Sequence, residues 1–282
     1  MATTDTGVIE AAAWSDDLWA ANTLAFGIVT GGGREESANI EKRGGISGKS
    51  VMRGGVYECS CSPEVLITYD TKTLLQKALR ASYPSGALPE IEVRVGGGVE
   101  YWEFNNAKID SAEVEVRYEE AATASFEIQG KSRTRTVAAL ASPTLSSENT
   151  MEWAFGNVTI GGVNYNCQRA RLSISNNVFR YGDCDTKAAS LKRLPVGIKE
   201  GTQEIELEVE IQTEHNVDLS ADTIVSNIGA VITLSDGTNT ITFTLTNLAL
   251  DERGWDFTGD DEIAAWSATL LADDNSAVLT IA

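Results

Sequence analysis

Alternating polar and apolar positions dominate the chain and predict a protein built mainly from β-strands. The clearest run is 204–211, where glutamates alternate with aliphatic residues, so one face of the strand is all carboxylate and the other all aliphatic. Glu113, Glu115 and Arg117 alternate with Val114, Val116 and Tyr118 in the same way. Turn-forming sequences at 96–98 and 235–239 separate such runs, as β-hairpins require.

Helical patterns are short and few. Residues 71–81 carry an apolar stripe of leucines and alanine, with Asp70 placed to cap the first turn, and we expect this helix to pack one face onto a sheet. A shorter helical pattern covers 220–229. Residues 31–56 and 175–202, which mix glycines with charges, are expected to be long irregular connections.

The sequence contains two internal echoes. Residues 25–33 (AFGIVTGGG) and 154–162 (AFGNVTIGG) agree at seven of nine positions, and each is interpreted as a glycine-rich turn between two strands. Residues 106–110 (NAKID) correspond to 247–251 (NLALD), each following a strand-like run with an aromatic residue. We therefore expect an N-terminal arm at 1–20, a first repeat at 21–130, a linker at 131–150 and a second repeat at 151–282.

Charge and composition exclude several function classes. The 282 residues include 41 acidic and 22 basic side chains, for a net charge of −19, which disfavours groove-type nucleic-acid binding. The single histidine, His215, has no evident Ser or Cys partner, so we expect no enzymatic activity. The longest nearly apolar run, 263–272, is too short to cross a bilayer, and the acidic N-terminus does not resemble a secretory signal.

The chain has four cysteines: Cys59, Cys61, Cys167 and Cys184. On a strand, Cys59 and Cys61 would share one face, and all four could form a zinc site if the two halves met there. The spacing is not that of a standard zinc-binding pair, so isolated reduced thiols are the favoured interpretation. The glutamates at 204–210 are interpreted as a solvated face rather than a cation site, and we expect no metal or cofactor.

The order of these elements resembles a known family. Residues 51–98 (VMRGG to VGGG) and 102–128 (WEFNN to FEI), together with 167–182, 192–201 and 204–211, resemble the major tail tube proteins of tailed viruses. The resemblance covers most of 20–282. It implies a mainly β fold with short helices, made of two tandem β-sandwich or half-barrel repeats, each with a flanking helix.

The resemblance also implies a function and an assembly. Subunits would join their sheets side by side into rings that stack into a tube, assembled in the host cytoplasm and located in the virion tail. Because single-repeat members form hexameric rings, a chain with two repeats is expected to form a ring of three with pseudo-sixfold symmetry. A hexamer that uses the second repeat as outer decoration is the alternative.

The tube would act as a conduit that lets double-stranded DNA slide, because a carboxylate-lined channel repels phosphate. The candidate lumen-facing residues are Glu113, Glu115, Glu204, Glu206, Glu208 and Glu210. The candidate contacts between rings are Trp14, Trp19, Arg34, Arg43, Lys49, Arg53, Arg180, Lys192 and Arg193.

The partners that the resemblance implies are further copies of the chain, a tape measure protein, a tail terminator and baseplate or tail tip proteins, with no membrane. Two other interpretations stay open: the tube of a contractile injection or secretion system, and a β-sandwich decoration or binding module. The acidity also fits a halophilic host, in which case negative charge would cover the whole surface and not only the channel.

Overall fold

The computed structural model describes residues 7–16, 24–37, 40–44, 50–54, 58–141, 143–146, 148–153, 157–181, 195–212, 227–256, 265–272 and 278–282. Within them the chain forms 21 strands and one helix, which confirms a mainly β protein. The elements of the first half are β1 (Gly7–Val8), β2 (Ala11–Ser15), β3 (Leu24–Ala25), β4 (Ile28–Ser37), β5 (Ile40–Gly44), β6 (Ser50–Gly54), β7 (Glu58–Leu66), α1 (Thr71–Lys77), β8 (Ile91–Gly96), β9 (Tyr101–Arg117), β10 (Thr123–Gly130) and β11 (Ser132–Thr136).

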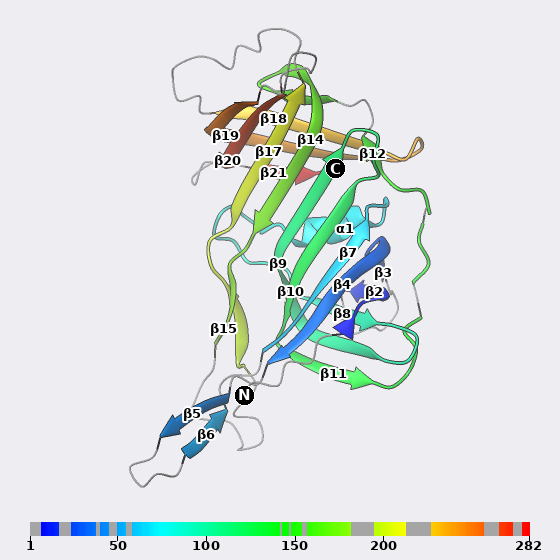
Figure 1. Ribbon diagram of the computed structural model, residues 1–282, viewed down its shortest axis with the longest axis vertical. Helices are drawn as coiled ribbons and strands as arrows, with labels where there is room; N and C mark the ends of the chain where they lie inside the picture. The colour runs from blue at the N-terminus through cyan, green and yellow to red at the C-terminus, as the bar shows by residue number, and fades with distance from the viewer. Residues whose placement is uncertain are drawn as a thin grey trace.

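The strands of the first half close into a six-stranded β-barrel (Figure 1). Strand β4, with β3 leading into it, pairs with β7, β7 with β10, β10 with β9, and β9 with β8. Strand β2 pairs with both β8 and β3 and so completes the circuit. All pairings are antiparallel, and β11 extends the ladder of β10 along β9.

The second half contains β12 (Glu152–Trp153), β13 (Asn157–Ile160), β14 (Val163–Ser175), β15 (Val178–Tyr181), β16 (Gly197–Glu200), β17 (Glu204–Gln212), β18 (Ile228–Ser235), β19 (Thr240–Asp256), β20 (Ala265–Ala272) and β21 (Val278–Ile281). Its pairings also return on themselves, in the order β13, β14, β17, β20, β19, β18 and back to β13.

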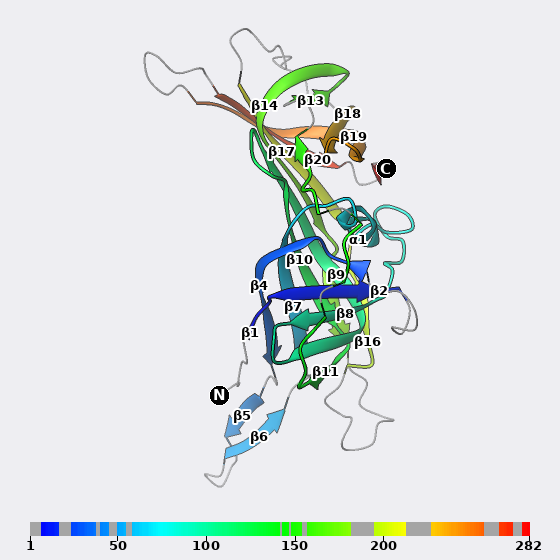
Figure 2. The ribbon, with the colours of Figure 1, turned by 90° about the vertical axis from the view of Figure 1, so that its right-hand side faces the viewer.

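One ladder joins the two halves. The last part of β9, from Ser111 to Arg117, pairs with Ser175 to Arg169 of β14. This creates a continuous sheet of eight strands in the order β4, β7, β10, β9, β14, β17, β20, β19. Figure 2 shows much of this sheet running along the length of the molecule, with β2, β8, β16 and β18 on one side of it. We call it the central sheet.

The order of pairings and their irregularities recur in the two halves. Strands β9 and β19 both have 17 residues, and each has an asparagine in the left-handed backbone region, Asn106 with φ 48° and Asn247 with φ 57°. The ladders β8–β9 and β18–β19 both shift register next to these asparagines. The ladders β4–β7 and β14–β17 also shift register at matching positions of β7 and β17, next to Val65 and Ile211, each the penultimate residue of its strand.

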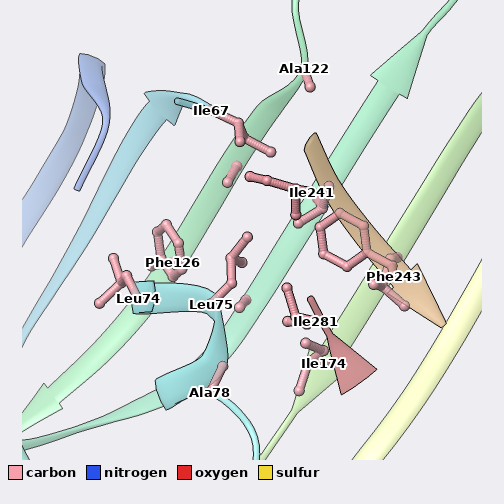
Figure 3. Packing of buried hydrophobic residues seen from close by; sticks show 14 of the residues in the cluster. Ile67, Leu74, Leu75, Ala78, Ala122, Phe126, Ile174, Ile241, Phe243 and Ile281 are labelled. Carbon is pink, nitrogen blue, oxygen red and sulfur yellow. The ribbon is translucent and has the colours of Figure 1, made fainter. Parts of the chain in front are cut away.

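Helix α1 packs between the two halves. Leu74, Leu75 and Ala78 are fully buried. Figure 3 shows Leu74 beside Phe126 of β10, while Leu75 faces Ile241 of β19 and Ile281 of β21. Gln76 Nε2 donates to the Ile281 carbonyl over 2.7 Å. The prediction of a helix from 71 is confirmed, although it ends at Lys77. Asp70 occupies the N-cap position but its side chain does not cap the helix, because it accepts hydrogen bonds from Ser146 instead.

A buried polar network beneath α1 also crosses between the halves. Asn176, which follows β14 and is fully buried, donates from Nδ2 to the carbonyls of Ala78 and Ile109, each over 3.0 Å. Its own carbonyl accepts from Arg80 Nη2 at 2.9 Å. Gln203 Nε2 donates to Asn176 Oδ1 at 2.8 Å and to the Ala78 carbonyl at 2.9 Å. Satisfied buried groups of this kind fix the relative position of the elements that carry them.

Several expectations for the connections are wrong. Gly31–Gly33 do not form a turn but lie within β4, paired with β7. Residues 31–56 contain the end of β4 and the hairpin β5–β6, and 175–202 contain the hairpin β15–β16, so neither segment is irregular throughout. In the expected arm, Ala11–Ser15 form β2 of the barrel, and in the expected linker Ser132–Thr136 form β11. The helical pattern at 220–229 falls largely outside the described residues.

Candidate functional site

One face of the central sheet is polar and exposed, and we call it the polar face. Its side chains come from alternate positions of each strand, because the opposite positions are buried in the two barrels. The described residues on it are Gly33, Glu35, Ser37, Glu58, Ser60, Ser62, Glu64, Ser111, Glu113, Glu115, Arg117, Thr123, Ser125, Glu127, Arg169, Arg171, Ser173, Ser175, Glu204, Glu206, Glu208, Glu210, Glu252, Ser267, Thr269 and Leu271.

All six glutamates expected to line a channel lie together on the polar face. Their register shows how they meet: Ser173 of β14 stands opposite Glu113 on one side and Glu206 on the other, and Arg171 stands between Glu115 and Glu208. Two runs of alternation that are about 90 residues apart in sequence are therefore neighbours in one sheet. Glu204 and Glu210 extend the same strand face in both directions.

Two arginines interrupt the carboxylates. Arg171 Nη2 lies 2.7 Å from Glu113 Oε2, and its Nη1 lies 3.4 Å from Glu208 Oε2. Arg169 Nε lies 2.6 Å from Glu115 Oε1, which also contacts Arg117 at 3.1 Å. Arg169 and Arg171 therefore both pair with glutamates of their own chain.

The glutamates of the polar face differ in the direction of their pKa shifts. Burial alone would raise the pKa of Glu115, but the hydrogen bonds from Arg169 and Arg117 lower it below its usual value. The pKa of Glu206 is raised, first by burial and then by the neighbouring charge of Glu208. The pKa of Glu127 is raised as well, by burial and by Asp110. The negative potential of the polar face is therefore strongest away from Arg169 and Arg171.

Apart from these charges, the polar face carries mainly small hydroxyl side chains. Shallow hollows on it are lined by Ser60, Ser62 and Ser125 in the first half and by Ser267 and Thr269 in the second. The large apolar side chains of the polar face include Leu271, which is 36% exposed, and Leu66, which is half-buried opposite Thr123. The face is therefore acidic and has shallow hollows with small side chains, so it has no deep pocket for a ligand among the described residues.

Each end of the central sheet has a strand edge that is largely unpaired within the described part of the chain. At one end, β19 pairs with β20 but residues 251–256 have no partner on their other side. At the other end, β4 pairs with β7, and its outer edge pairs with β1 at Gly33 and Arg34. An unpaired strand edge is a template for adding another strand, so both edges are able to pair with further copies.

Three of the residues expected at contacts between rings, Trp14, Arg34 and Arg180, have partners within the described part of the chain. Trp14 is fully buried in the first barrel, where its Nε1 donates to the Ala25 carbonyl over 3.1 Å, and it offers no exposed surface. Arg34 stacks 4.7 Å from the Trp102 ring centroid and pairs with Glu100 over 2.8 Å. Arg180 donates to the backbone carbonyls of Gly130 and Cys59.

The remaining residues of that set are not described in full. Arg43 lies in β5 and Arg53 in β6, both in a hairpin that projects from the end of the molecule (Figure 1). Trp19, Lys49, Lys192 and Arg193 lie outside the described residues.

The described cysteines are buried thiols. Cys59 and Cys61 point to the same side of β7, as expected, and that side is the barrel interior. Burial raises the pKa of Cys59 to about 11 and that of Cys167 to about 12. In the described part of the chain, no group of three or more potential ligands is placed to hold a metal ion. Cys184 is outside that part.

Sequence reasoning missed five further acidic residues of the polar face: Glu35, Glu58, Glu64, Glu127 and Glu252. Glu127 had a visible signal, since Thr123, Ser125 and Glu127 alternate with buried residues along β10. The glutamates of β4 and β7 lie in runs rich in glycine, cysteine and serine, where the contrast between the two faces is weak. Only the register of β4, β7 and β10 reveals that they share the face.

A family model for phage tail tube proteins matches residues 2–277. The chain belongs to this family. It is therefore a structural, non-enzymatic component of the tail tube in the virion tail, as the resemblance implied. A comparison with curated protein sequences finds no match. No helix in the described residues has the length and hydropathy needed to span a membrane.

Proposed function

We propose that this tail tube protein forms a closed ring of three chains in which the polar face lines the channel. The observation that carries the proposal is the central sheet itself: it has one acidic, exposed face, and a largely unpaired strand edge at each end. Copies that pair edge to edge, β19 of one against β4 of the next, extend the sheet around a ring. Closure removes the exposed edges that would otherwise promote aggregation.

The ring of three rests on an internal duplication, which we propose from the recurrence of the pairings. The series β4, β7, β8, β9, β10, β11 has the same partners as the series β14, β17, β18, β19, β20, β21. Asn106 and Asn247 mark the same position in both. Each chain then supplies two equivalent barrels, and three chains supply the six units of a pseudo-sixfold ring.

The width of the channel favours three chains over six. Each chain contributes eight strands, so three chains form a barrel of about 24 strands; with strands about 4.8 Å apart and tilted by about 40°, its backbone diameter is about 48 Å. A ring of six chains built in the same way would be about 96 Å across. The narrower ring leaves room for a DNA duplex once side chains line it. It also keeps the duplex close to the acidic side chains of the channel wall.

Passage of DNA follows from the chemistry of the lining. Phosphates are repelled by the glutamates, including Glu113, Glu206 and Glu208, so the duplex has no stable binding position along the channel. Arg169 and Arg171 are held by glutamates of the same chain and do not offer free cations to phosphate. The serines and threonines keep the surface hydrated.

Partners follow from the same assembly. Successive rings stack through the projecting hairpins β5–β6 and β15–β16, and the ends of the tube contact a tape measure protein, a tail terminator and baseplate or tail tip proteins. The basic residues Arg43, Lys49 and Arg53, in and beside the first hairpin, and Lys192 and Arg193, beside the second, remain the contacts that we propose between rings, together with Trp19.

Negative-stain electron microscopy of the purified chain over a concentration and salt series tests the proposal. End-on averages should show rings with a central hole and three chains that appear as six units. Rings with six chains and an outer layer of density would replace our assembly with the hexamer. Monomers at every concentration and salt would contradict polymerisation and favour a decoration module.

A further inference from the structure

We propose that β1 is a placeholder strand: it occupies the edge of β4 that receives β19 of the next copy, and it must leave this edge before the ring can close. The inference rests on the proposed function, because it concerns the edges through which the chains join. It adds a built-in control of assembly, in which the chain's own N-terminal strand competes with the incoming copy.

The first step is the equivalence of β4 and β14. Each is the first strand of the central sheet in its half, paired with β7 and β17 respectively. The register of the first ladder shifts between Val29 and Gly31, and that of the second between Cys167 and Arg169. Aligning these two shifts places Gly33 at the position of Arg171, and both residues lie on the polar face.

The second step compares what covers the outer edge at this position. On β14, Arg171 and Leu172 pair with Glu115 and Val114 of β9. On β4, the equivalent residues Gly33 and Arg34 pair with β1. Strand β1 therefore takes the position that a β9-type strand takes in the joint between the two halves.

The third step identifies the strand that belongs there. The equivalent of β9 is β19, whose residues 251–256 have no partner on their outer side in the described structure. Transferring the register of the β9–β14 ladder through Asn106 and Asn247 places Ser37 opposite Glu252 and Gly33 opposite Asp256 of the next copy. The internal joint thus serves as a template for the joint between chains.

The β1–β4 ladder is shorter than the β9–β14 ladder, as the proposed exchange requires. Strand β1 contributes two residue pairs on β4, Gly7 with Arg34 and Val8 with Gly33, whereas the internal joint contains seven. A short covering strand protects the edge of a free chain from uncontrolled pairing. Because a longer ladder replaces it, the exchange favours the assembled ring once a neighbouring copy is in place.

A reversible disulfide tests the exchange. Ile9 N donates to Gly32 O over 3.2 Å, so Ile9 and Gly32 form a hydrogen-bonded pair and the adjacent pair, Val8 and Gly33, is not hydrogen-bonded. Cα atoms of such a pair are about 4.5 Å apart, within the range of a disulfide. A Cβ on Gly33 has room, since its nearest neighbour, Ser62 Oγ, would lie 3.5 Å away. The lock is therefore the double variant V8C/G33C, made in a Cys184→Ser background.

Assembly is followed by sedimentation and electron microscopy, with V8C and G33C alone as controls. We expect the oxidised lock to form at least tenfold less tube than the parent and to recover fully when a reductant is added, while both controls assemble like the parent in either state. Equal assembly of the oxidised lock and the parent, with the disulfide verified, would overturn the exchange and leave the proposed function standing.

A second pair of variants opens the edge instead of locking it. Gly7 pairs with Arg34 as Ile9 does with Gly32, so its N–H points toward β4, whereas that of Val8 points away. Gly7→Pro removes a donor from the β1–β4 ladder and should lower the concentration needed for assembly at least threefold, and Val8→Pro is the matched control. Equal behaviour of the two variants would count against the placeholder role. If the parent, the reduced lock and Gly7→Pro all stay monomeric, both the inference and the proposed function fail.

Discussion

Arg171 of β14 donates to the Glu113 carboxylate of β9 over 2.7 Å, diagonally across the ladder that joins the two halves. The same guanidinium reaches Glu208 on β17, so one cation serves glutamates from both halves. Hydrogen bonding to Glu113 is the main reason that the pKa of Arg171 is raised. The contacts of Arg171 with Glu113 and Glu208 therefore offset part of the repulsion among the glutamates of the polar face.

Replacing Arg171 by Gln should therefore reduce stability. We expect a loss of about 1 kcal/mol, or about 2–4 °C in Tm, because its side chain is 34% exposed and water screens the pairs. Arg117, 52% exposed and paired within its own strand, is the matched control, and Arg117→Gln should cost less than about 0.5 kcal/mol. Thermal unfolding at low and high salt measures both, and equal losses for the two variants would contradict the role of Arg171.

Glu206 and Glu115 should respond to neutralisation with opposite signs. The folded-state pKa of Glu206 is raised, so its contribution to stability is present below the unfolded pKa and is lost as pH rises through the folded pKa. The folded-state pKa of Glu115 is lowered, so its contribution is present above the unfolded pKa and is lost as pH falls through the folded pKa.

At pH 7, Glu206→Gln should thus raise the free energy of unfolding by about 0.5 kcal/mol, and Glu115→Gln should lower it by a similar amount. Both differences should shrink in acid, where the carboxyl groups are protonated. Urea unfolding at pH 7 and at low pH measures them. If both variants change the free energy of unfolding in the same direction at pH 7, the arginines do not stabilise Glu115 relative to Glu206.

Asn106 and Asn247 should tolerate glycine but not a β-branched residue. Both have positive φ, which glycine adopts freely and valine does not. We expect Asn→Gly at either position to change stability by less than about 0.5 kcal/mol and Asn→Val to cost about 1–2 kcal/mol. Chemical denaturation of the four variants measures this, and a clear difference between the two sites would weaken the proposed duplication.

Asn176 should be sensitive even to a small change. Asn176→Ala removes the donors to Ala78 and Ile109 and leaves buried groups without partners, at a cost of about 2–3 kcal/mol. The exposed Asn166 of β14, the strand that precedes Asn176, is the control, and Asn166→Ala should change stability by less than about 0.5 kcal/mol. If the two variants unfold at the same denaturant concentration, the network does not stabilise the junction.

The described thiols should be unreactive in the folded protein. Cys59, Cys61 and Cys167 are buried and their pKa values are raised by burial, so little thiolate forms at pH 8. In a Cys184→Ser background, Ellman's reagent should modify none of the three before unfolding and all three afterwards. Rapid modification of the native protein would contradict the burial of this side of β7 and β14.

Local patterns in the sequence predicted the strands and the acidic face, because alternation depends only on a strand's own two sides. The run 204–211 is an example: its glutamates are on the polar face and its aliphatic residues are in the barrel. The echo at 106–110 and 247–251 begins with Asn106 and Asn247, which both have positive φ and lie next to a register shift. Both signals are carried by residues that are close together in sequence.

Features that depend on long-range pairing were not predictable. Gly32 lies within β4, and the position requires glycine because a Cβ there would meet Ser62 O at 2.2 Å. In the sequence, a glycine that allows two strands to approach closely cannot be distinguished from a glycine in a turn. The sequence predicts Trp14 as a contact between rings, and only the pairing of β2 with β8 explains its burial. The partners of Arg169 and Arg171 depend on the register of β9 against β14.

Cryo-electron microscopy of assembled tubes tests the central claim most directly, because a reconstruction counts the chains in each ring and shows which face of the sheet lines the channel. The account predicts three chains per ring, a continuous sheet through β19 and β4 of successive copies, and Glu206 and Glu208 pointing into the channel. A ring of six chains, or a channel lined by another face of the molecule, would contradict it.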